Sequence, residues 1–418
     1  MKIKLSPRKL WTISLVLYII CSSAFSYGSL RMLNTYALYF FLGISLFNIM
    51  TCNKVKLNPA MYCIILYALL MFFGMLYTPT SQSAAQGVLY NYVTMAVIVF
   101  CVVQYMRSIE DVKTIMFAYM LAGLALAIYV YAQYGNEFWT MMKEATESDV
   151  GNVDRLGGGV TNVNTIGMFT MFSALIAAYN IIFDRTTKKK TWFCLAVGIF
   201  CFMVSMAAAS KKSVVILLVA CICIWLYSSL GNKNSEKQLR NFLILIGCTV
   251  LFFWMINTLP IFSAISNRLN SLFDSMDGGS GTVSEANRSA FTKKGLSVWL
   301  DNFLIGGGTA SSIHYLGVYA HNNYVELLMN SGIFGFALFY GIYPMTISKY
   351  FTNAITYKRQ NKLSILLFSM FICVCVSGIA LVYYYERYFM ILMTVIFSAT
   401  EIFDKETFKE VRLEGERV

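Results

Sequence analysis

The feature that most constrains this chain is a series of apolar runs, each of about 20 residues, that recurs along its whole length. A helix of about 20 residues crosses the roughly 30 Å hydrocarbon core of a bilayer. In lipid, only helices and closed barrels satisfy every backbone hydrogen-bonding group. Hydrophobic residues make up 58% of the 418 residues and charged residues 13%, which is too apolar for a soluble domain. We therefore expect an all-α, polytopic integral membrane protein.

Placing one helix on each apolar run predicts about twelve transmembrane helices. The predicted spans are approximately 11–28, 33–50, 60–78, 88–106, 112–134, 164–183, 191–209, 213–230, 241–258, 323–347, 363–383 and 387–403. Most lysines and arginines fall in the two tails and in every second connection, so the positive-inside rule predicts that both termini are cytoplasmic. The net charge of +12 is then explained by topology and by contact with anionic headgroups, without nucleic acid.

The predicted spans divide the chain into four regions. Residues 1–134 form an N-terminal scaffold of five spans, and residues 348–403 form the last two spans before a cytoplasmic tail at 404–418. Between them, residues 135–347 carry spans six to ten and two long outer loops, 135–163 and 259–322. In the second loop, 265–273 and 287–299 have the periodicity of amphipathic helices lying on the membrane surface. Because the spans are nearly free of charge, we expect any chemistry in these loops.

The most informative segment runs from Arg288 to Gly335. It contains both histidines of the chain, His314 and His321, and a triple glycine at 306–308 that allows a sharp turn or a close backbone approach. Arg288 lies in the first turn of a predicted surface helix, where free N–H groups attract anions. A lone histidine at a membrane interface is more often a structural hydrogen-bonding residue than a catalyst, so a catalytic role for His321 depends on its neighbours.

Three more cations are predicted on the outer face. Arg155 precedes a glycine run and the residues Asn162 and Asn164, and an arginine there could hold a phosphate through two hydrogen bonds. The alternative for this loop is a flexible turn with a solvated charge. Lys211 and Lys212 occupy a short outer connection, against the positive-inside trend. They form either an anion site or a pair of lysines whose charged ends reach the interface.

The order of these residues resembles the core of the O-antigen ligase and O-antigen polymerase (Wzy-type) superfamily of membrane glycosyltransferases. The resemblance is carried by Arg288, then His321-Asn322-x-Tyr324-Val325-Glu326, then Gly332-x-x-Gly335. Two upstream elements agree with it: Arg155…Gly159…Asn162-x-Asn164 is similar to an Arg…Gly…Asn-Pro-Asn element, and Ser210-Lys211-Lys212 stands where the family usually has Ser-Arg-Gly.

The chain also departs from the family pattern at three places. Val163 replaces the proline between the two asparagines, and lysines replace the usual arginine, which keeps the charge but loses the bidentate fork. Leu304 or Ile305 stands where a proline usually precedes the Gly-x-Gly. These departures leave open which lysine would replace the arginine.

The resemblance implies a fold of the GT-C type and a location in the bacterial inner membrane, with the active site on the extracytoplasmic side. It implies a donor glycan carried on undecaprenyl diphosphate, no cofactor and no required metal. The implied activity is a polymerase that joins oligosaccharide repeat units into a surface polysaccharide such as O-antigen or capsule. A flippase and a chain-length regulator would be its partners.

The residues themselves fit such a reaction, because breaking a sugar–diphosphate bond leaves negative charge on the departing group. Arg288, Arg155 and Lys211 or Lys212 are outer cations that could stabilise it. His321 is the predicted base for the acceptor hydroxyl, since imidazole titrates near neutral pH and nearby cations favour its neutral form.

The remaining predicted site residues have supporting roles. Asn322, Tyr324 and Glu326 are expected to orient His321 or the sugar, and Asn162 and Asn164 to bind the substrate beside Arg155. The outer loops contain no Asp-x-Asp or paired-carboxylate motif that would hold a metal ion.

Two alternatives remain open. The shared motifs also fit an O-antigen ligase, which transfers the glycan to a lipid or cell-wall acceptor. A flippase or transporter for lipid-linked oligosaccharide would suit twelve spans with both ends inside. Transporters usually carry ionisable residues at the bilayer midplane and show repeated halves, and this chain has neither feature.

Overall fold

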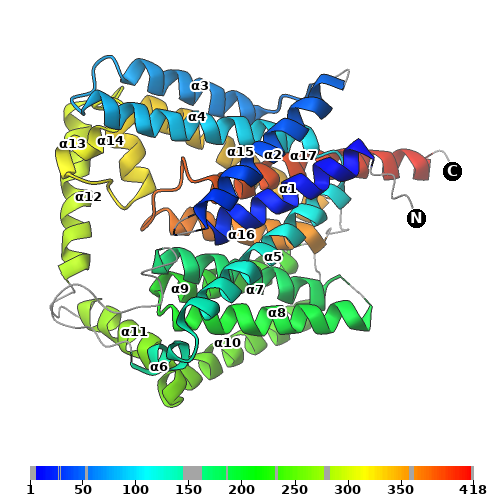
Figure 1. Cartoon of the computed structure of the whole chain (residues 1–418). Coiled ribbons are helices and arrows are strands. Elements are labelled where there is room, and N and C mark those ends of the chain that lie inside the picture. The colour runs from blue at the N-terminus through cyan, green and yellow to red at the C-terminus, as the bar shows by residue number, and fades with distance from the viewer. Residues whose placement is uncertain are drawn as a thin grey trace. The chain divides into compact units, whose positions relative to one another are not determined.

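The computed structural model describes residues 6–26, 28, 30–51, 55–144, 162–184, 187–230, 234–276, 283–356 and 362–415, and these residues form helices without any strand (Figure 1). Among them, eight helices are long and apolar enough to cross a membrane. Two shorter apolar helices, Pro59–Gly74 and Lys362–Ser377, accompany them. The all-α class is confirmed, and the long apolar helices indicate a membrane protein; the count of twelve spans and the GT-C type stay predictions.

The described residues form the following helices in chain order. They are α1 (Pro7–Ala24), α2 (Arg31–Thr51), α3 (Pro59–Gly74), α4 (Gln82–Tyr105), α5 (Ile109–Tyr134), α6 (Glu137–Glu144), α7 (Val163–Ile182), α8 (Lys188–Ala207), α9 (Lys211–Ser229), α10 (Ser235–Thr258), the 3-10 helix η1 (Pro260–Phe262), α11 (Ser263–Met276), α12 (Val283–Asp301), α13 (Ser311–Leu316), α14 (Asn323–Tyr340), α15 (Ile342–Thr356), α16 (Lys362–Ser377) and α17 (Arg387–Gly415). Each predicted span overlaps one of these helices, whereas α6 and α13 lie where we predicted loop.

Side-chain caps explain where several helices begin. The Asn58 side chain accepts a hydrogen bond from the Met61 N–H at 3.0 Å before α3, and Asn234 accepts from the Lys237 N–H at 3.0 Å before α10. Ser6 and Thr187 cap α1 and α8 in the same way. A cap oxygen satisfies an N–H group that has no partner within the helix, so these short polar residues set the helix starts.

The chain forms two compact units, each assembled from three separate segments. Unit 1 comprises Met1–Ile44, Lys113–Val283 and Ala354–Cys373, and unit 2 comprises Ser45–Val112, Ser284–Asn353 and Val374–Val418. In unit 1, α7 packs against α8 and α9, and α11 packs against α6. In unit 2, α3 and α4 lie side by side, α14 packs on α3, and α17 packs on α4 (Figure 1).

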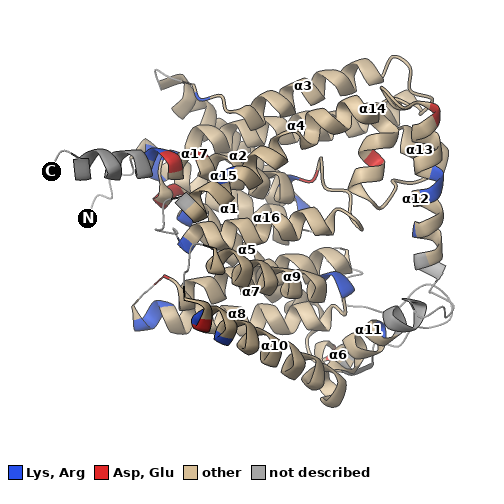
Figure 2. Cartoon of the chain, turned by 180° about the vertical axis from the view of Figure 1, so that it is seen from behind, with Lys and Arg blue, Asp and Glu red and all other residues tan. Residues whose placement is uncertain are grey.

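Small residues and aromatic rings make this packing possible. In unit 1, the Ser205 hydroxyl donates to the Gly167 carbonyl oxygen at 2.8 Å, which joins α8 to α7. In unit 2, the rings of Tyr67, Tyr92 and Tyr384 pack together with centroids 5.2–6.2 Å apart. Helices α3 and α4 carry no Lys, Arg, Asp or Glu over their length, as the tan ribbons show (Figure 2).

The two predicted surface helices fall inside α11 and α12. In α11 the apolar side chains of Ile265 and Leu269 are buried, as the periodicity predicted. In α12 the side chain of Val298 is buried and that of Phe291 is partly buried, but Leu296 is 37% exposed. The buried part of the apolar face of α12 is therefore narrower than predicted, and Val298 packs on Val325 and Met329 in the first half of α14.

Candidate functional site

The candidate site in unit 2 is built on the start of α14. The Asn322 side chain caps this helix by accepting hydrogen bonds from the N–H groups of Tyr324 at 3.0 Å and Val325 at 3.2 Å. The preceding residue, His321, has a φ of 56°, in the left-handed region that few residues other than glycine adopt. Such strain persists only where surrounding contacts impose it, and it is common at functional sites.

Aromatic rings border the His321 imidazole on two sides. The Tyr319 ring lies 4.1 Å from it between centroids, tilted by 52°, and the Phe291 ring of α12 lies 6.2 Å from it, nearly parallel. All three side chains are partly buried. The imidazole is therefore held in a defined orientation while one part of it stays accessible.

Arg288 belongs to the same neighbourhood. It lies one turn before Phe291 on α12, on the face that continues through Gly295 and Val298 onto α14. Burial raises the pKa of the Tyr319 hydroxyl, the Arg288 guanidinium lowers it, and the Glu386 and Glu326 carboxylates raise it. Tyr319 thus experiences the field of Arg288 while it touches His321. The two residues predicted to be catalytic are therefore linked through Tyr319 and Phe291, and their joint role in catalysis stays a prediction.

Glu326 is buried beneath this surface, with 3% of its side chain exposed. One carboxylate oxygen accepts from the Ser312 hydroxyl at 2.6 Å and from the Asn330 amide at 3.1 Å. The other accepts from the Ala320 N–H at 2.6 Å. Both oxygens are used by the chain itself, and the Ala320 bond immediately precedes His321. Glu326 is therefore placed to hold the loop that carries His321, and its predicted contact with the sugar stays a prediction.

Asn323 is a residue to which the sequence analysis assigned no role. Its side chain is fully buried; its carbonyl oxygen accepts from the N–H groups of Tyr383 at 2.8 Å and Tyr384 at 3.0 Å, and its amide donates to the Tyr340 hydroxyl at 2.7 Å. The Tyr324 hydroxyl donates to the Cys375 carbonyl at 2.7 Å. The bonds to Tyr383 and Tyr384 fasten the start of α14 to the loop between α16 and α17, and the bond to Cys375 fastens it to the end of α16. The sequence signal that could have identified Asn323 is an amide side chain within the apolar start of a helix, because a buried amide needs hydrogen-bond partners.

The two glycine motifs meet in space. Helix α14 is broken at Gly332, whose φ of 62° and ψ of −168° are accessible to glycine alone. The loop at 303–308 fills the break: the Gly307 N–H donates to the Met329 carbonyl at 2.7 Å, and the Ile333 N–H donates to the Phe303 carbonyl at 2.9 Å. A Cβ on Gly306 or Gly332 would collide with the opposing backbone. The structure therefore confirms the prediction that the triple glycine allows a close backbone approach.

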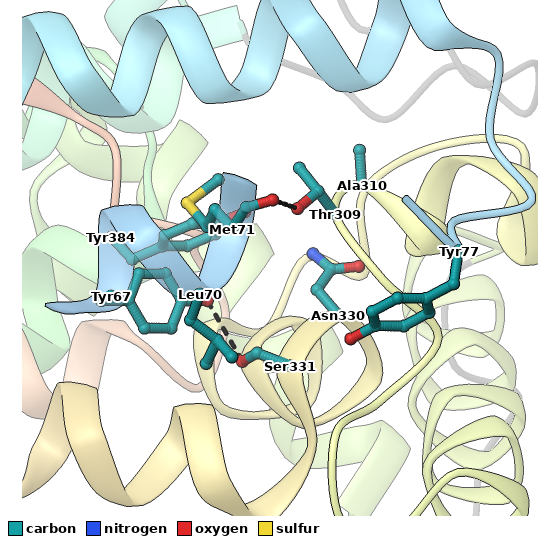
Figure 3. A pocket seen from close by; sticks show the side chains of 9 residues that line it. All are labelled: Tyr67, Leu70, Met71, Tyr77, Thr309, Ala310, Asn330, Ser331 and Tyr384. Carbon is teal, nitrogen blue, oxygen red and sulfur yellow. Dashed lines mark hydrogen bonds between the residues drawn. The ribbon is translucent and has the colours of Figure 1, made fainter. Parts of the chain in front are cut away.

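A small cavity with several hydroxyl groups in its lining lies behind the break, between α3 and the loop (Figure 3). Its lining includes the hydroxyl groups of Tyr67, Ser331 and Thr309 and the Asn330 amide, and the Tyr67 hydroxyl is 3.2 Å from Ser331 Oγ. Its volume of about 10 Å³ has room for about one water molecule. A sugar does not fit there.

A larger cavity of about 440 Å³ between α3 and α4 is lined by apolar side chains such as Ile65, Phe72 and Val93 and offers no hydrogen-bonding group to a sugar. We therefore take the partly exposed surface around His321 as the candidate substrate surface of unit 2.

Unit 1 holds the second group of predicted residues. Asn162 caps α7 by accepting from the Asn164 N–H at 2.9 Å, and the Asn164 side-chain oxygen accepts from the Ser210 hydroxyl at 3.0 Å. Ser210 directly precedes α9, whose first residues are Lys211 and Lys212, both partly buried. The two asparagines and the two lysines are therefore neighbours within unit 1. Arg155 lies outside the described residues.

Two charged residues near the site were also missed. Glu386 and Arg387 stand at the start of α17; Glu386 is exposed and Arg387 is partly buried. Glu386 acts electrostatically on Tyr319, whose pKa it raises. Their positions follow from the fold of unit 2, and no motif marks them. Within the described ranges, no group of three or more His, Cys, Asp or Glu side chains is placed to hold a metal ion.

Comparison of the chain with models of known protein families finds no match, and comparison with individually characterised proteins finds none either. The likeness to the O-antigen ligase and polymerase superfamily therefore depends on the motif residues alone.

Proposed function

We propose that the protein is a membrane glycosyltransferase that joins oligosaccharide units carried on undecaprenyl diphosphate into a longer polysaccharide. The observation that carries this proposal is that Tyr319 packs on the His321 imidazole and lies within the electrostatic influence of Arg288. The backbone of His321 is strained, and two aromatic rings flank its imidazole. Arg288 lies one helical turn from Phe291, which carries one of those rings. A base beside a cation matches what glycosyl transfer from a diphosphate requires.

In this reaction an acceptor hydroxyl attacks the anomeric carbon of the donor sugar. The bond from that carbon to the diphosphate oxygen breaks, and its electron pair leaves with the diphosphate. His321 takes the proton from the attacking hydroxyl, which raises the nucleophilicity of the oxygen. Arg288 stabilises the negative charge that develops on the leaving group, because a guanidinium donates two parallel hydrogen bonds to phosphate oxygens.

The residues of unit 1 are proposed to bind the same class of ligand. Lys211 and Lys212 begin α9, where the helix dipole adds to their positive charge. The Ser210 hydroxyl donates to the Asn164 side-chain oxygen and makes no side-chain cap to α9, so it joins the two asparagines to the start of this helix. The positive charge at the start of α9 suits a diphosphate.

The test uses purified protein in liposomes with an undecaprenyl-diphosphate oligosaccharide. We expect His321→Ala to lower the rate of polymer formation and of undecaprenyl diphosphate release by about 10²–10⁴-fold, the usual contribution of a general base. His314→Ala is the matched control, because His314 is the other histidine and is exposed on α13. It should leave the rate unchanged.

Arg288→Ala should lower the same rate on the order of 10²-fold, whereas Lys293→Ala, an exposed cation of the same helix, should not. Full polymer from both His321→Ala and Arg288→Ala would rule the proposal out. Release of undecaprenyl diphosphate with a single transfer to a different acceptor would point to the ligase activity. Movement of the intact donor across the bilayer without bond cleavage would point to a transporter.

A further inference from the structure

The end of α12 carries a cluster of apolar side chains that the protein itself leaves uncovered. We call the cluster the apolar tip, and it consists of Leu300, Phe303, Leu304 and Ile305 with Phe334 of α14. Their exposed fractions are 64%, 46%, 64%, 51% and 68%. Contiguous apolar surface of this kind usually marks an interaction site.

The apolar tip is held firmly by its backbone. The N–H groups of Ile333 and Phe334 donate to the carbonyl oxygens of Phe303 at 2.9 Å and Leu304 at 3.1 Å, and the Tyr77 hydroxyl donates to the Ile305 carbonyl at 3.0 Å. The main-chain carbonyls therefore point into the protein while the side chains point outward. Such a loop can face lipid, because these polar backbone groups need no water.

The same bonds set the level of the apolar tip in the membrane. Helices α14 and α15 form one candidate span, and Gly332 breaks it. From the break to the end of that span, residues 333–355 are about 23 residues, or roughly 34 Å at 1.5 Å per residue, close to the thickness of the hydrocarbon core. Phe303 and Leu304 pair with the first two residues of this stretch, so they lie at the edge of the core.

The sequence around the apolar tip has the composition of a membrane edge. The exposed Asp301 is the last charged residue before a stretch, 302–313, that carries none. Trp299 lies one turn before Phe303, and its indole N–H donates to the Phe303 carbonyl at 3.1 Å. Tryptophan is enriched at the boundary between lipid and water. By contrast, Lys293 and Lys294 in the middle of α12 are exposed and charged.

We propose that the apolar tip inserts into the lipid leaflet at the His321 end of α14, with phospholipid acyl chains as its partner. The tip thereby fastens one end of α12 to the bilayer. Since α12 carries Arg288 and Phe291 toward His321, this anchor keeps the candidate site at the membrane surface. The inference requires only that the chain is a membrane protein and is independent of the proposed function.

The test compares cysteine variants of the purified protein, one copy per nanodisc of phosphatidylethanolamine and phosphatidylglycerol, treated with a charged maleimide. Both faces of a nanodisc are open to the reagent. We expect Leu304→Cys to react at least ten-fold more slowly than Lys293→Cys and His314→Cys, which are exposed positions of the same segment. Because Leu304 is 64% exposed in the protein, only lipid can protect it there. The parent protein carries eleven cysteines of its own, so its rate of maleimide labelling is subtracted from the rate of each variant.

Equal labelling of the three positions would overturn the proposal. Protection of Leu304→Cys in native membranes but not in the nanodiscs would also overturn it, because a protein partner rather than lipid would then shield the cysteine. A second measurement uses lipids brominated on their acyl chains. Because the chain has six tryptophans of its own, both variants are made in a protein whose native tryptophans are replaced by phenylalanine. Fluorescence of Leu304→Trp should be quenched by these lipids and that of Lys293→Trp should not; quenching of neither variant would also contradict the insertion.

Discussion

At the scale of single residues, the structure distinguishes side chains on the candidate substrate surface from buried side chains that fix the position of the loop carrying them. His321 is strained, partly exposed and bordered by rings. Glu326 is buried and saturated with donors from Ser312, Ala320 and Asn330. A buried carboxylate with three donors is stable, but the loss of its charge leaves the donors with too few acceptors.

We therefore predict that Glu326→Gln lowers the free energy of unfolding by about 1–3 kcal/mol, the usual effect of one buried donor losing its acceptor. If the glutamine side-chain oxygen accepts a hydrogen bond from the Ala320 N–H, the glutamine NH₂ group faces the Asn330 NH₂ group, and two donors then lie opposite each other without an acceptor. Thermal unfolding of the purified protein in detergent measures the effect. Glu236→Gln, at an exposed carboxylate of α10, is the control and should leave the melting temperature nearly unchanged. Equal melting of both variants and the parent would show that the Glu326 bonds contribute nothing.

At the scale of elements, the break in α14 is what brings the glycine motifs together. The break at Gly332 leaves main-chain groups of α14 without hydrogen-bond partners in the helix itself, and the loop at 303–308 supplies those partners. The interlock needs a left-handed residue in the helix and close backbone contact in the loop. Glycine is the residue that meets both requirements.

We predict that Gly332→Ala destabilises the protein by about 2 kcal/mol or more, because the added Cβ meets the Leu304 backbone and the backbone angles are strained for alanine. The matched control is Gly87→Ala in α4, where no atom of the described residues lies within 4 Å of the place that the added methyl group takes, and where alanine favours the helix. Melting temperature and the yield of monodisperse protein measure both variants. A Gly332→Ala protein as stable as the Gly87→Ala protein would contradict the interlock.

At the scale of the whole molecule, the distribution of charge predicts how the chain is oriented. Lysines and arginines are concentrated in the tails and in alternate connections, and such an excess is retained on the cytoplasmic side during insertion. The proposed function needs the opposite side for His321, because a lipid-linked donor is used at the outer face.

We predict that alkaline phosphatase fused after residue 418 is inactive, because the enzyme folds only outside the cytoplasm, and that a fusion after residue 316 is active. A fluorescent protein fused at the same two positions should give the reverse pattern. The measurement is activity per amount of fusion protein in the membrane fraction. Activity of the fusion at 418 together with inactivity at 316 would place His321 in the cytoplasm and exclude the proposed reaction.

Much of the fold was predictable because lipid leaves so few choices. A run of about 20 apolar residues must satisfy its backbone internally, so its helical state follows from local sequence alone. Each predicted span accordingly overlaps a helix. The short helices α6 and α13 were missed because they have only eight and six residues and depend on neighbouring elements for their stability.

For the candidate site, the sequence by itself determined which residue types were available: two histidines, a few outer cations and two glycine motifs. Their proximity was decided only by the tertiary structure. The left-handed backbone of His321, the donors around Glu326 and the loop that fills the break at Gly332 depend on contacts between residues far apart in the chain. Local preferences set each helix, but a break, a strained residue or a buried carboxylate is stable only where distant groups supply its hydrogen bonds.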